Sequence, residues 1–278
     1  MDRNEVTLVV GGTGKTGRRV VERLQRLGLP LCVGSRSGQP AFNWEDRKTW
    51  PSALGGVTRA YVSYYPDVCV PGAVETVRSF FAYAVNAGVK RLVFLSGRGE
   101  VEAEQAEQAL QASGADWTIL RCSFFSQNFS ENFFLDPILA GEVALPVAPV
   151  GEPFVDAEDI ADVAVAALTQ PGHSRQVYEL TGPRALTFAD AIAEIARVTR
   201  RNIRYASVSP EEYRAALLQA QVPQEVIELV LYSLAPCSTV VILQQPTESS
   251  ARSAVGHATS PSTCSVLPRA AFGEANHG

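Results

Sequence analysis

A run of glycines near the start of the chain constrains its fold more than any other feature of the sequence. Four of the seven residues from 11 to 17 are glycine, and they directly follow the apolar run Val6–Val10. The segment after them, residues 18–27, carries apolar residues at the spacing of one helix face. A strand that passes through glycines into a helix is typical of the first turn of a parallel α/β sheet.

The positions of these glycines predict a site for a dinucleotide. Gly12, Gly14 and Gly17 fit the pattern G-x-G-x-x-G, and Gly11 with the last two fits the looser G-x-x-G-x-x-G. The first glycine permits a tight turn, the second lets the backbone approach a pyrophosphate, and the third allows close packing of helix on strand. Free amides and the helix dipole then stabilise the anion. The residues expected to bind the cofactor here are Gly11, Gly12, Thr13, Gly14, Lys15, Thr16 and Gly17.

A nucleoside-triphosphate loop is the rival interpretation, because Gly14-Lys15-Thr16 resembles the end of G-x-x-x-x-G-K-[ST]. The opening glycine of that motif would have to stand at position 9, which is Val9. The later apolar run 91–96 ends in a serine, where an acidic residue would be needed to hold magnesium. The dinucleotide interpretation fits better, because it also explains the glycine at position 17.

The end of the second expected strand predicts which dinucleotide binds. A site for NAD places Asp or Glu there, about 20 residues after the glycines, to bind the ribose 2′-hydroxyl. This chain has Ser35, Arg36 and Ser37 instead. A guanidinium and two hydroxyls can bind a 2′-phosphate, and no carboxylate is present to repel it. We therefore expect NADP(H), with Ser35, Arg36 and Ser37 at the 2′-phosphate.

Strand-like and helix-like segments alternate through the first half of the chain, which predicts a parallel sheet with helices on both faces. The expected strands are 6–10, 31–34, a short one at Phe42 and Trp44, 59–65, 91–96 and 117–121. The expected helices are 18–27, 49–54, a long one opened by Pro71 and closed by Gly88, and 100–112. The expected fold class is therefore α/β, a Rossmann-type doubly wound parallel sheet with a small α+β substrate lobe.

Composition and spacing divide the chain into three expected parts. Residues 1–150 form the NADP-binding Rossmann core, and residues 151–232 form a C-terminal substrate lobe, some of whose strands can join the core sheet. In the lobe we expect helices after Asp156, Thr187 and Ser209, and strands at 177–180 and 203–208. Residues 233–278 are rich in Ser, Thr and Pro without periodicity, which is typical of a disordered tail.

Charge and residue usage exclude several classes of function. Lys and Arg total 24 against 29 Asp and Glu, so the basic excess of a nucleic-acid-binding protein is absent. No run approaches the roughly 18 apolar residues of a membrane span, and no signal-peptide pattern opens the chain, so we expect a cytoplasmic protein that binds no membrane. The five cysteines and three histidines are scattered, which predicts neither a metal site nor a disulfide framework.

The helix expected at 100–112 lacks the residues that mainstream short-chain dehydrogenases use for catalysis. Those enzymes protonate the developing alkoxide with a tyrosine, which a lysine follows four residues later. Residues 100–112 contain neither, and Lys90 is the last lysine of the chain. Ser96 ends the expected fifth strand, where a catalytic serine beside the cofactor could stand. A strand-end hydroxyl that bonds to backbone is the alternative for Ser96.

This absence bears on the substrate. Hydride transfer to a neutral ketone creates an oxyanion, which needs a proton donor or an oxyanion site. An iminium ion, a quinone or a cationic dye can accept hydride with little more than proximity and orientation. The sequence therefore favours hydride transfer to an electrophilic small molecule, such as an iminium, an imine or a quinone.

Several segments together resemble the NmrA-like atypical short-chain dehydrogenases. Within that family they are most similar to the festuclavine and agroclavine dehydrogenase-like branch of ergot alkaloid biosynthesis. The resemblance covers about residues 5–232 and is carried by 11–16, 35–37, Phe42-Asn43-Trp44 with Asp46, Thr49-Trp50, 113–121, 125–129 and 154–161. It implies an NADP-dependent reductase of an iminium-type or other conjugated electrophile that works without the Tyr-Lys pair.

Two further groups of residues are candidates because of where they lie in such a fold. The residues at the end of the fourth expected strand should border the nicotinamide side of the cofactor: Tyr64, Tyr65 and Pro66. Those after the sixth expected strand could form an aromatic wall against a flat substrate: Phe124, Phe125, Asn128 and Phe129. For both groups ordinary core packing is the alternative, because aromatic side chains bury readily.

Two functions therefore stay open. The first is an NADPH-dependent reductase of a small molecule, and the second is a non-catalytic NADP(H)-sensing regulatory protein of NmrA type. The missing Tyr-Lys pair and the unusual end of the chain favour the second, and the aromatic segment favours the first. A monomer or a homodimer is compatible with either function.

Overall fold

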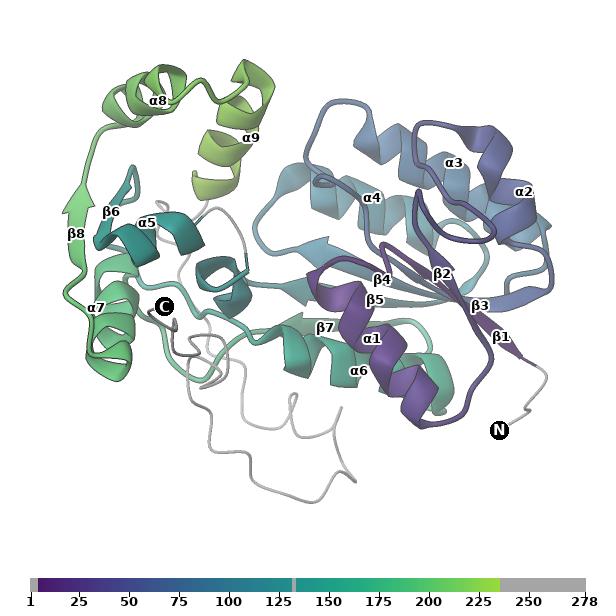
Figure 1. The fold of residues 1–278 in the computed structure, drawn as a ribbon. Coiled ribbons are helices and arrows are strands. Elements are labelled where there is room, and N and C mark those ends of the chain that lie inside the picture. Colours follow the sequence, from purple (N-terminus) through teal and green to yellow (C-terminus); the bar gives the residue numbers. More distant parts are fainter. Residues whose placement is uncertain (1–4, 132–133, 236–278) are drawn as a thin grey trace, which may run out of the picture. The chain divides into compact units, whose positions relative to one another are not determined.

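The computed structural model describes residues 5–131 and 134–235 (Figure 1). The chain forms two compact units whose segments interleave along the sequence. Within the described residues, the first unit consists of 5–123 and 157–180, and the second of 124–131, 134–156 and 181–235. The sequence led us to divide the chain at residues 150 and 232, and most of the expected tail, 233–278, lies outside the described residues.

The first unit is built on a six-stranded parallel sheet with the order β2-β1-β3-β4-β5-β7. Its strands are β1 (Val6–Val10), β2 (Leu31–Gly34), β3 (Val57–Val62), β4 (Arg91–Gly97), β5 (Asp116–Cys122) and β7 (Gln176–Leu180). The chain moves outward from β1 to β2 and then returns to β3 on the other side of β1. Open α/β sheets bind ligands at the carboxyl ends of the strands where the order reverses in this way. The expected Rossmann-type fold class is confirmed.

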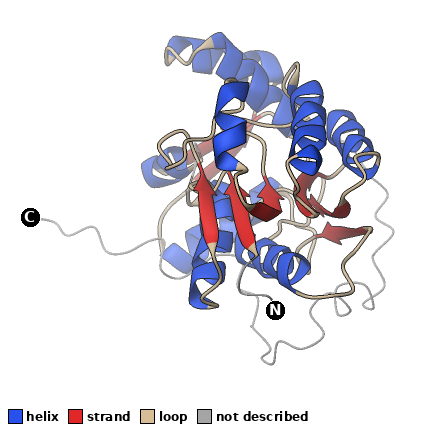
Figure 2. Ribbon diagram, turned by 90° about the vertical axis from the view of Figure 1, so that its right-hand side faces the viewer, coloured by secondary structure: helices blue, strands red, loops and turns tan. Residues whose placement is uncertain are grey.

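Helices cover both faces of this sheet. In Figure 1, α1 and α6 lie on one face, and α3 and α4 lie on the other; Figure 2 shows the strands in red among helices in blue. The helical elements of this unit are α1 (Lys15–Arg26), η1 (Arg47–Thr49), α2 (Trp50–Ala53), α3 (Ala73–Asn86), α4 (Val101–Gln111) and α6 (Ala157–Thr169). Among the described helices, none combines the length and apolar character that crossing a membrane requires.

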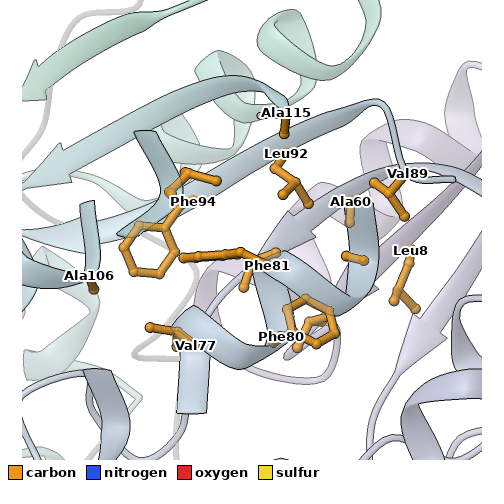
Figure 3. Close-up of a cluster of buried hydrophobic side chains, with 14 of the residues drawn as sticks. Leu8, Ala60, Val77, Phe80, Phe81, Val89, Leu92, Phe94, Ala106 and Ala115 are labelled. Atoms are coloured by element: carbon orange, nitrogen blue, oxygen red, sulfur yellow. The ribbon is translucent and has the colours of Figure 1, made fainter. Parts of the chain in front are cut away.

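The core of this unit lies where the sheet meets α3 and α4 (Figure 3). Leu8, Ala60 and Leu92 come from three neighbouring strands and are fully buried with Phe80 and Phe81 of α3. Burial of a large apolar side chain stabilises the fold by about 1.5–3 kcal/mol relative to exposure. Because helices cover the sheet on both faces, its inner strands are nearly continuous apolar runs. This layer holds the carboxyl ends of the strands in place.

The short strand expected at Phe42 and Trp44 is wrong, because the segment forms no strand in the described structure. Both side chains are buried against Phe80, with ring centroids 5.4 and 5.1 Å from its ring. The Asn43 N–H donates to Thr49 Oγ1 at 3.0 Å rather than to a neighbouring strand. The segment is therefore held by the burial of two rings in the core and by a hydrogen bond to a nearby side chain. Within the described residues it does not pair with a neighbouring strand.

Among the element boundaries that differ from expectation, two concern segments that follow β3. β3 ends at Val62, so the expected strand 59–65 runs too far. Tyr64, Tyr65 and Pro66 therefore lie in the segment that leaves the sheet. α3 begins at Ala73 and not at Pro71, because Gly72 precedes it with a φ of +84°, a left-handed conformation that ends the preceding turn.

The second unit contains a small parallel sheet of two strands, β6 and β8, with helices around it. Its elements are η2 (Ser126–Phe129), α5 (Leu135–Ala140), β6 (Glu142–Leu145), α7 (Phe188–Thr199), β8 (Arg204–Ser207), α8 (Pro210–Gln219) and α9 (Gln224–Leu234). The expected caps are confirmed at Thr187 and Ser209, each of which forms a capping box with the acidic residue three positions later. The sequence analysis missed α5, β6 and α9.

Candidate functional site

The glycine-rich turn connects β1 to α1 at the carboxyl edge of the sheet. The N–H of Gly11 donates to the carbonyl oxygen of Gly34 at 3.0 Å, which ties the turn to the end of β2. Gly11 has a φ of +72°, and its carbonyl oxygen accepts from the N–H of Gly14 at 2.9 Å. The turn is therefore closed by its own backbone, in a conformation that a residue with a Cβ atom adopts only with strain.

Two of the glycines are required by packing. A Cβ atom on Gly17 would overlap the carbonyl group of Gly11, with the carbonyl carbon only 2.7 Å away, and would lie 2.8 Å from the Cα of Gly12. A Cβ atom on Gly12 would lie 2.9 Å from Cγ1 of Val33 in β2. Contacts under 3.0 Å require the backbone to move, so helix and turn can approach this closely only with glycine at both positions.

The outer side of the turn is open. Thr13 and Gly14 are exposed, whereas Gly12, Thr16 and Gly17 are buried. A Cβ atom on Gly14 would meet one atom of the described chain within 4 Å, the carbonyl oxygen of Gly11 at 3.2 Å. Gly14 is also the N-cap of α1, and among the described residues no side chain caps the helix and none in its first turn is acidic. The end of this 12-residue helix therefore fits an anionic group, which its dipole and amides stabilise.

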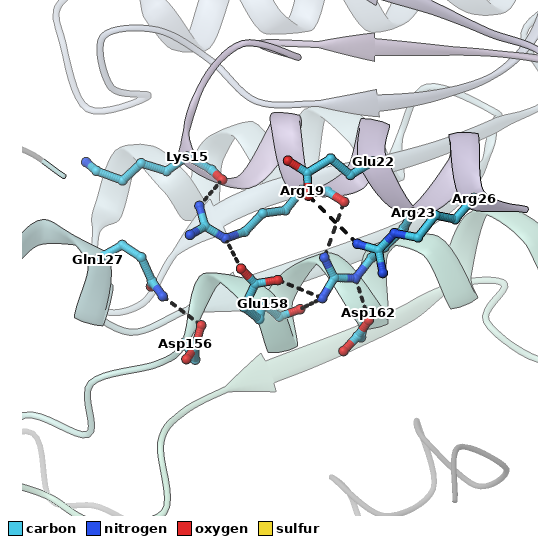
Figure 4. A network of polar contacts seen from close by, with 9 residues as sticks. All are labelled: Lys15, Arg19, Glu22, Arg23, Arg26, Gln127, Asp156, Glu158 and Asp162. Carbon is cyan, nitrogen blue, oxygen red and sulfur yellow. Dashed lines mark hydrogen bonds and ion pairs between the residues drawn. The ribbon is translucent and has the colours of Figure 1, made fainter. Parts of the chain in front are cut away.

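Ion pairs anchor α1 to α6 on the sheet face beneath the turn (Figure 4). The Arg19 side chain is buried, donates from Nε to Glu158 at 2.5 Å, and donates from Nη1 to the carbonyl oxygen of Lys15 at 2.8 Å. Arg23 donates to Asp162 at 2.5 Å and to Glu158 at 2.9 Å. Although burial opposes it, the two guanidinium groups lower the pKa of Glu158. These contacts fix the start of α1 through charged groups on the side of the helix that packs against α6.

Thr16 is fixed in a different way from the outer residues of the turn. Its Oγ1 accepts a hydrogen bond from the Tyr61 hydroxyl at 2.8 Å, and both side chains are buried. Burial raises the pKa of Tyr61 above its usual range, so this phenol stays protonated and keeps donating. The hydroxyl of Thr16 therefore supports the turn from within the sheet.

The residues expected at a 2′-phosphate lie just after β2. Arg36 and Ser37 are exposed, and Ser35 is half-buried where its carbonyl oxygen accepts from the N–H of Phe42 at 2.8 Å. The guanidinium of Arg36 lies over the ring of Tyr65, 5.6 Å from the centroid. Within the described part of the chain Arg36 forms no ion pair with a carboxylate, so its charge is available to an anion.

Tyr64 and Tyr65 differ although they are neighbours. Tyr64 packs on Trp44 with a centroid distance of 4.8 Å, and burial raises the pKa of its phenol. Tyr65 is 66% exposed and presents its ring to Arg36. The structure therefore brings Tyr65 to the residue expected at the adenosine end of the cofactor, whereas the sequence analysis expected it at the nicotinamide end.

Ser96 lies at the end of β4, as expected, but its hydroxyl is engaged. It is 4% exposed, and its Oγ donates to Glu107 of α4 at 2.5 Å. Glu107 also accepts from Arg121 of β5 at 2.5 and 3.0 Å, and Arg121 donates to Glu179 of β7 at 3.2 Å. The hydrogen bond to Glu107 raises the pKa of Arg121 above its already high value. This network runs from the buried Ser96 and Glu107 to the exposed Glu179 and connects three strands with α4. It leaves Ser96 bound to a protein carboxylate.

A cluster that the sequence analysis missed lies at the carboxyl ends of β3 and β4, and we call it the Asp67–Cys69–Glu100 cluster. Its carboxylate oxygens and thiol sulfur lie within 4.8 Å of one another. Burial, together with the negative charge of Asp67, raises the pKa of Glu100 to about 7. Burial and the same carboxylates raise the pKa of the Cys69 thiol, so a cation could bind all three groups only by displacing a tightly held proton.

The expected substrate residues lie in the second unit and divide into core and edge. Phe129 is 1% exposed and packs on Phe134, Phe154 and Phe188, with centroids 5.2–5.9 Å apart. Phe124 is half-buried against the same rings, at 5.4–6.1 Å. Phe125 and Asn128 are also half-buried, and the N–H of Asn128 donates to the carbonyl oxygen of Phe125 at 3.0 Å. The Phe129 side chain belongs to the core of this unit, and the other three stay accessible in part.

A small cavity lies elsewhere in the second unit, among Val147, Phe188, Tyr205 and neighbouring residues of β8 and α7. Its volume is about 130 Å³, and its lining is mostly apolar. Sites for small-molecule ligands usually measure about 300–1,000 Å³. This cavity is therefore smaller than the usual site for a small-molecule ligand.

The chain is similar over most of its length to known reductases. It is 33% identical over 253 residues to an NAD(P)H azoreductase of Xenophilus azovorans, across 82% of this chain and 87% of the relative. It is 31% identical over 236 residues to the agroclavine dehydrogenase of Claviceps fusiformis, across 78% of this chain and 82% of the relative. Its fold matches an Escherichia coli NADPH-dependent quinone oxidoreductase complexed with NADPH, with a TM-score of 0.74 and 22% identity over 92% of this chain and 96% of that one. No family model matches the chain.

Proposed function

Because the chain belongs to the atypical short-chain dehydrogenase/reductases, in the branch of the agroclavine and festuclavine dehydrogenases, we propose that it is an NADP(H)-dependent reductase of electrophilic small molecules. The observation that carries the proposal is the turn from Gly11 to Gly17. Its backbone closes on itself, and it leaves the uncapped amino end of α1 open to an anion. The NmrA-like subdivision that the motifs suggest is part of the same proposal.

The cofactor would lie along the carboxyl edge of the sheet with its pyrophosphate at this turn. Amides of the turn and the dipole of α1 would stabilise the pyrophosphate, and Arg36 with the hydroxyls of Ser35 and Ser37 would bind the 2′-phosphate. We assign Tyr65 to the same adenosine end, because its ring lies under the Arg36 guanidinium. When bound, NADPH supplies a hydride, and the residues named here supply only binding and orientation.

The substrate class follows from two considerations. The relatives include an enzyme named for azo compounds and another named for a clavine alkaloid, both of which contain conjugated or electrophilic nitrogen. In this chain α4 carries neither tyrosine nor lysine, and Ser96 is bound to Glu107. We therefore propose azo compounds, quinones and iminium ions as acceptors, with Ser96 as a supporting residue rather than a proton donor.

Phe124, Phe125 and Asn128 are the proposed substrate contacts of the second unit, because their side chains are half-buried. Phe129 contributes by holding these residues in place through the aromatic core. We further propose that the protein works in the cytoplasm, as a monomer or homodimer, and that its three described cysteines remain free thiols there.

The decisive experiment measures binding and turnover on the same preparation. Calorimetry with NADPH, NADP+, NADH and NAD+ should show tight binding of the two phosphorylated forms. NADPH oxidation should then occur with at least one azo dye, quinone or iminium salt. Absence of any binding would refute the cofactor site. Tight NADP(H) binding without turnover of any acceptor would refute the reductase and support the alternative, an NADP(H)-sensing regulatory protein of NmrA type.

A further inference from the structure

The Asp67–Cys69–Glu100 cluster is not among the residues that we assign to cofactor binding. It contains a group that can donate a proton, which is the task of the tyrosine that α4 lacks. We propose that Glu100 donates the proton that a neutral acceptor requires when it is reduced. This inference rests on the proposed reductase function, and it names the source of the proton for the neutral acceptors proposed there, quinones and azo compounds. It revises the expectation that a quinone needs only proximity and orientation.

The fold places the cluster at the edge of the sheet where the substrate would react. β3 and β4 are parallel neighbours whose last paired residues are Val62 and Phe94. Asp67 and Cys69 follow β3, and Glu100 follows β4, so all three lie beyond the carboxyl ends of adjacent strands. Open α/β sheets bind their ligands at that edge. β3 is also next to β1, whose carboxyl end carries the glycine turn.

Glycine at position 97 allows the Glu100 carboxyl to fold back onto the end of β4. A Cβ atom on Gly97 would overlap this carboxyl group, with Cδ of Glu100 2.5 Å away. Any other residue at 97 would push the carboxyl away from the strand. Gly97 directly follows Ser96 and ends β4, so the Glu100 carboxyl lies one residue beyond the serine at the carboxyl end of the strand.

The groups around Glu100 favour its protonated form. Among the described residues, those that act on it are Asp67 and Cys69 from the segment after β3 and Glu102 from α4. Two of these are carboxylates, which oppose a third negative charge nearby. The Cys69 thiol is hydrogen-bonded to Glu100, and this contact by itself lowers the pKa of Glu100, but burial and the two carboxylates outweigh it. The pKa of the thiol is itself raised, so it stays protonated.

The helix position of Glu100 has the opposite effect. Glu100 is the N-cap of α4, where the helix dipole favours a carboxylate, but its side chain makes no capping hydrogen bond. The stabilisation from a helix terminus is smaller than the cost of burying a charge beside another carboxylate. The pKa of Glu100 is accordingly about 7, which is the range for a general acid at neutral pH.

The proton balance of the step is simple. When a neutral acceptor gains a hydride at one end of its double bond or conjugated system, an electron pair moves to a second atom at the other end, which in a quinone is the distal oxygen. The Glu100 O–H bond breaks, and its proton forms a bond to that second atom. Water then reprotonates the Glu100 carboxylate. An acceptor that is already cationic becomes neutral when it gains a hydride, so it needs no proton.

The test compares the two classes of acceptor in Glu100→Gln, with Glu104→Gln as the matched control, because Glu104 is exposed on the same helix. Menadione serves as the neutral acceptor, and a cationic triarylmethane dye as the other. We expect Glu100→Gln to lower kcat for menadione by about 100-fold or more, the usual contribution of a general acid. Turnover of the cationic dye should change far less, and Glu104→Gln should match the wild type with both. Equal losses with both acceptors, or no loss with menadione, would overturn the inference.

Two further measurements separate proton donation from a structural role. In the wild type, kcat for menadione should fall about tenfold per pH unit above pH 7, and Asp67→Asn should move this fall to lower pH, since it removes the nearest charge. In the protein without cofactor, carbon-13 NMR of labelled glutamate should show one carboxyl titrating near pH 7 that is missing from Glu100→Gln. Absence of that signal would overturn the inference by itself. A wild type that binds NADPH but reduces neither acceptor would overturn the proposed function instead.

Discussion

The glycine turn after β1 and the Asp67–Cys69–Glu100 cluster lie at the same edge of one sheet, but they are built in opposite ways. The turn consists of backbone groups, and its shape depends on side chains that are missing at positions 12 and 17. The cluster consists of side chains, and its properties depend on burial and charge. A contiguous segment of seven residues forms the first, whereas in the second Glu100 meets two residues that precede it by 31 and 33 positions.

This difference determines how each region should respond to change. A site made of backbone tolerates no added atom but is insensitive to pH, because amides do not titrate. In a site made of interacting carboxyl groups, an isosteric substitution leaves the structure intact but removes the group that titrates. The four predictions below test this contrast, and each pairs a variant with a control.

Gly17→Ala should produce the largest effect. Alanine usually stabilises a helix interior by about 1 kcal/mol relative to glycine, but here its Cβ would overlap the Gly11 carbonyl group. We expect a net loss of about 3 kcal/mol in the free energy of unfolding, measured by urea denaturation, together with loss of NADPH binding. Gly55→Ala is the control, because its Cβ would lie 3.5 Å from the carbonyl oxygen of Ser52, which is an ordinary van der Waals contact. Equal stability of both variants would show that the turn can move, and the contrast would fail.

Arg36→Ala tests the charged side chain that we assign to the 2′-phosphate of the cofactor. Removing a charge-assisted contact should weaken NADPH binding by about 1.5–3 kcal/mol, or roughly 10- to 150-fold in Kd. NADH binding should stay unchanged, because NADH lacks the 2′-phosphate. Arg47→Ala removes the same charge from an exposed side chain that lies over Trp50 and serves as control. A parallel loss of affinity for NADH and NADPH would contradict the assignment.

Glu100→Gln should change how the free energy of unfolding depends on pH. The pKa of Glu100 is about 7 in the folded protein against 4.5 for an ordinary glutamate, so the folded state binds more protons between these values. The contribution of Glu100 to stability is therefore complete below pH 4.5 and is lost as the pH rises through 7. We expect Glu100→Gln to be more stable relative to the wild type at pH 8 than at pH 5, by about 2 kcal/mol.

Chemical denaturation at the two pH values measures this difference. Glu104→Gln should show no such pH-dependent gain, since its carboxyl group is exposed. A constant difference between Glu100→Gln and wild type at both pH values would mean that Glu100 ionises like an exposed glutamate.

Tyr65→Ala should have the smallest effect. The ring holds the Arg36 guanidinium by a cation–π contact at an exposed site, which is worth about 0.5–1 kcal/mol. NADPH binding, measured by calorimetry, should weaken about two- to fivefold, because Arg36 would lose its preferred orientation. Tyr65→Phe keeps the ring and should bind like the wild type. A loss that affects NADH equally would place Tyr65 elsewhere along the cofactor.

The sequence predicted the first of the two regions well and the second not at all. The parallel fold, β1, β2 and the caps at Thr187 and Ser209 could be predicted because each depends on residues close together in the chain. The strand expected at Phe42 and Trp44 was wrong, because burial against Phe80 decided the path of that segment. The hydrogen bond of Ser96 could not be predicted either, because its partner Glu107 lies on a helix that packs against the strand.

The amino-acid sequence by itself determined the family, the α/β fold and the glycine turn, because steric limits at glycine and hydrophobic periodicity act over a few neighbouring residues. Only the tertiary structure decided the surroundings of Tyr65, Ser96 and Glu100. The charge state of a carboxyl group depends on its burial and on other charges within a few ångströms, and strand pairing brings those charges together from distant parts of the chain. Glu100 appears in the sequence as one glutamate among several, and the fold buries it beside other carboxylates that raise its pKa to about 7.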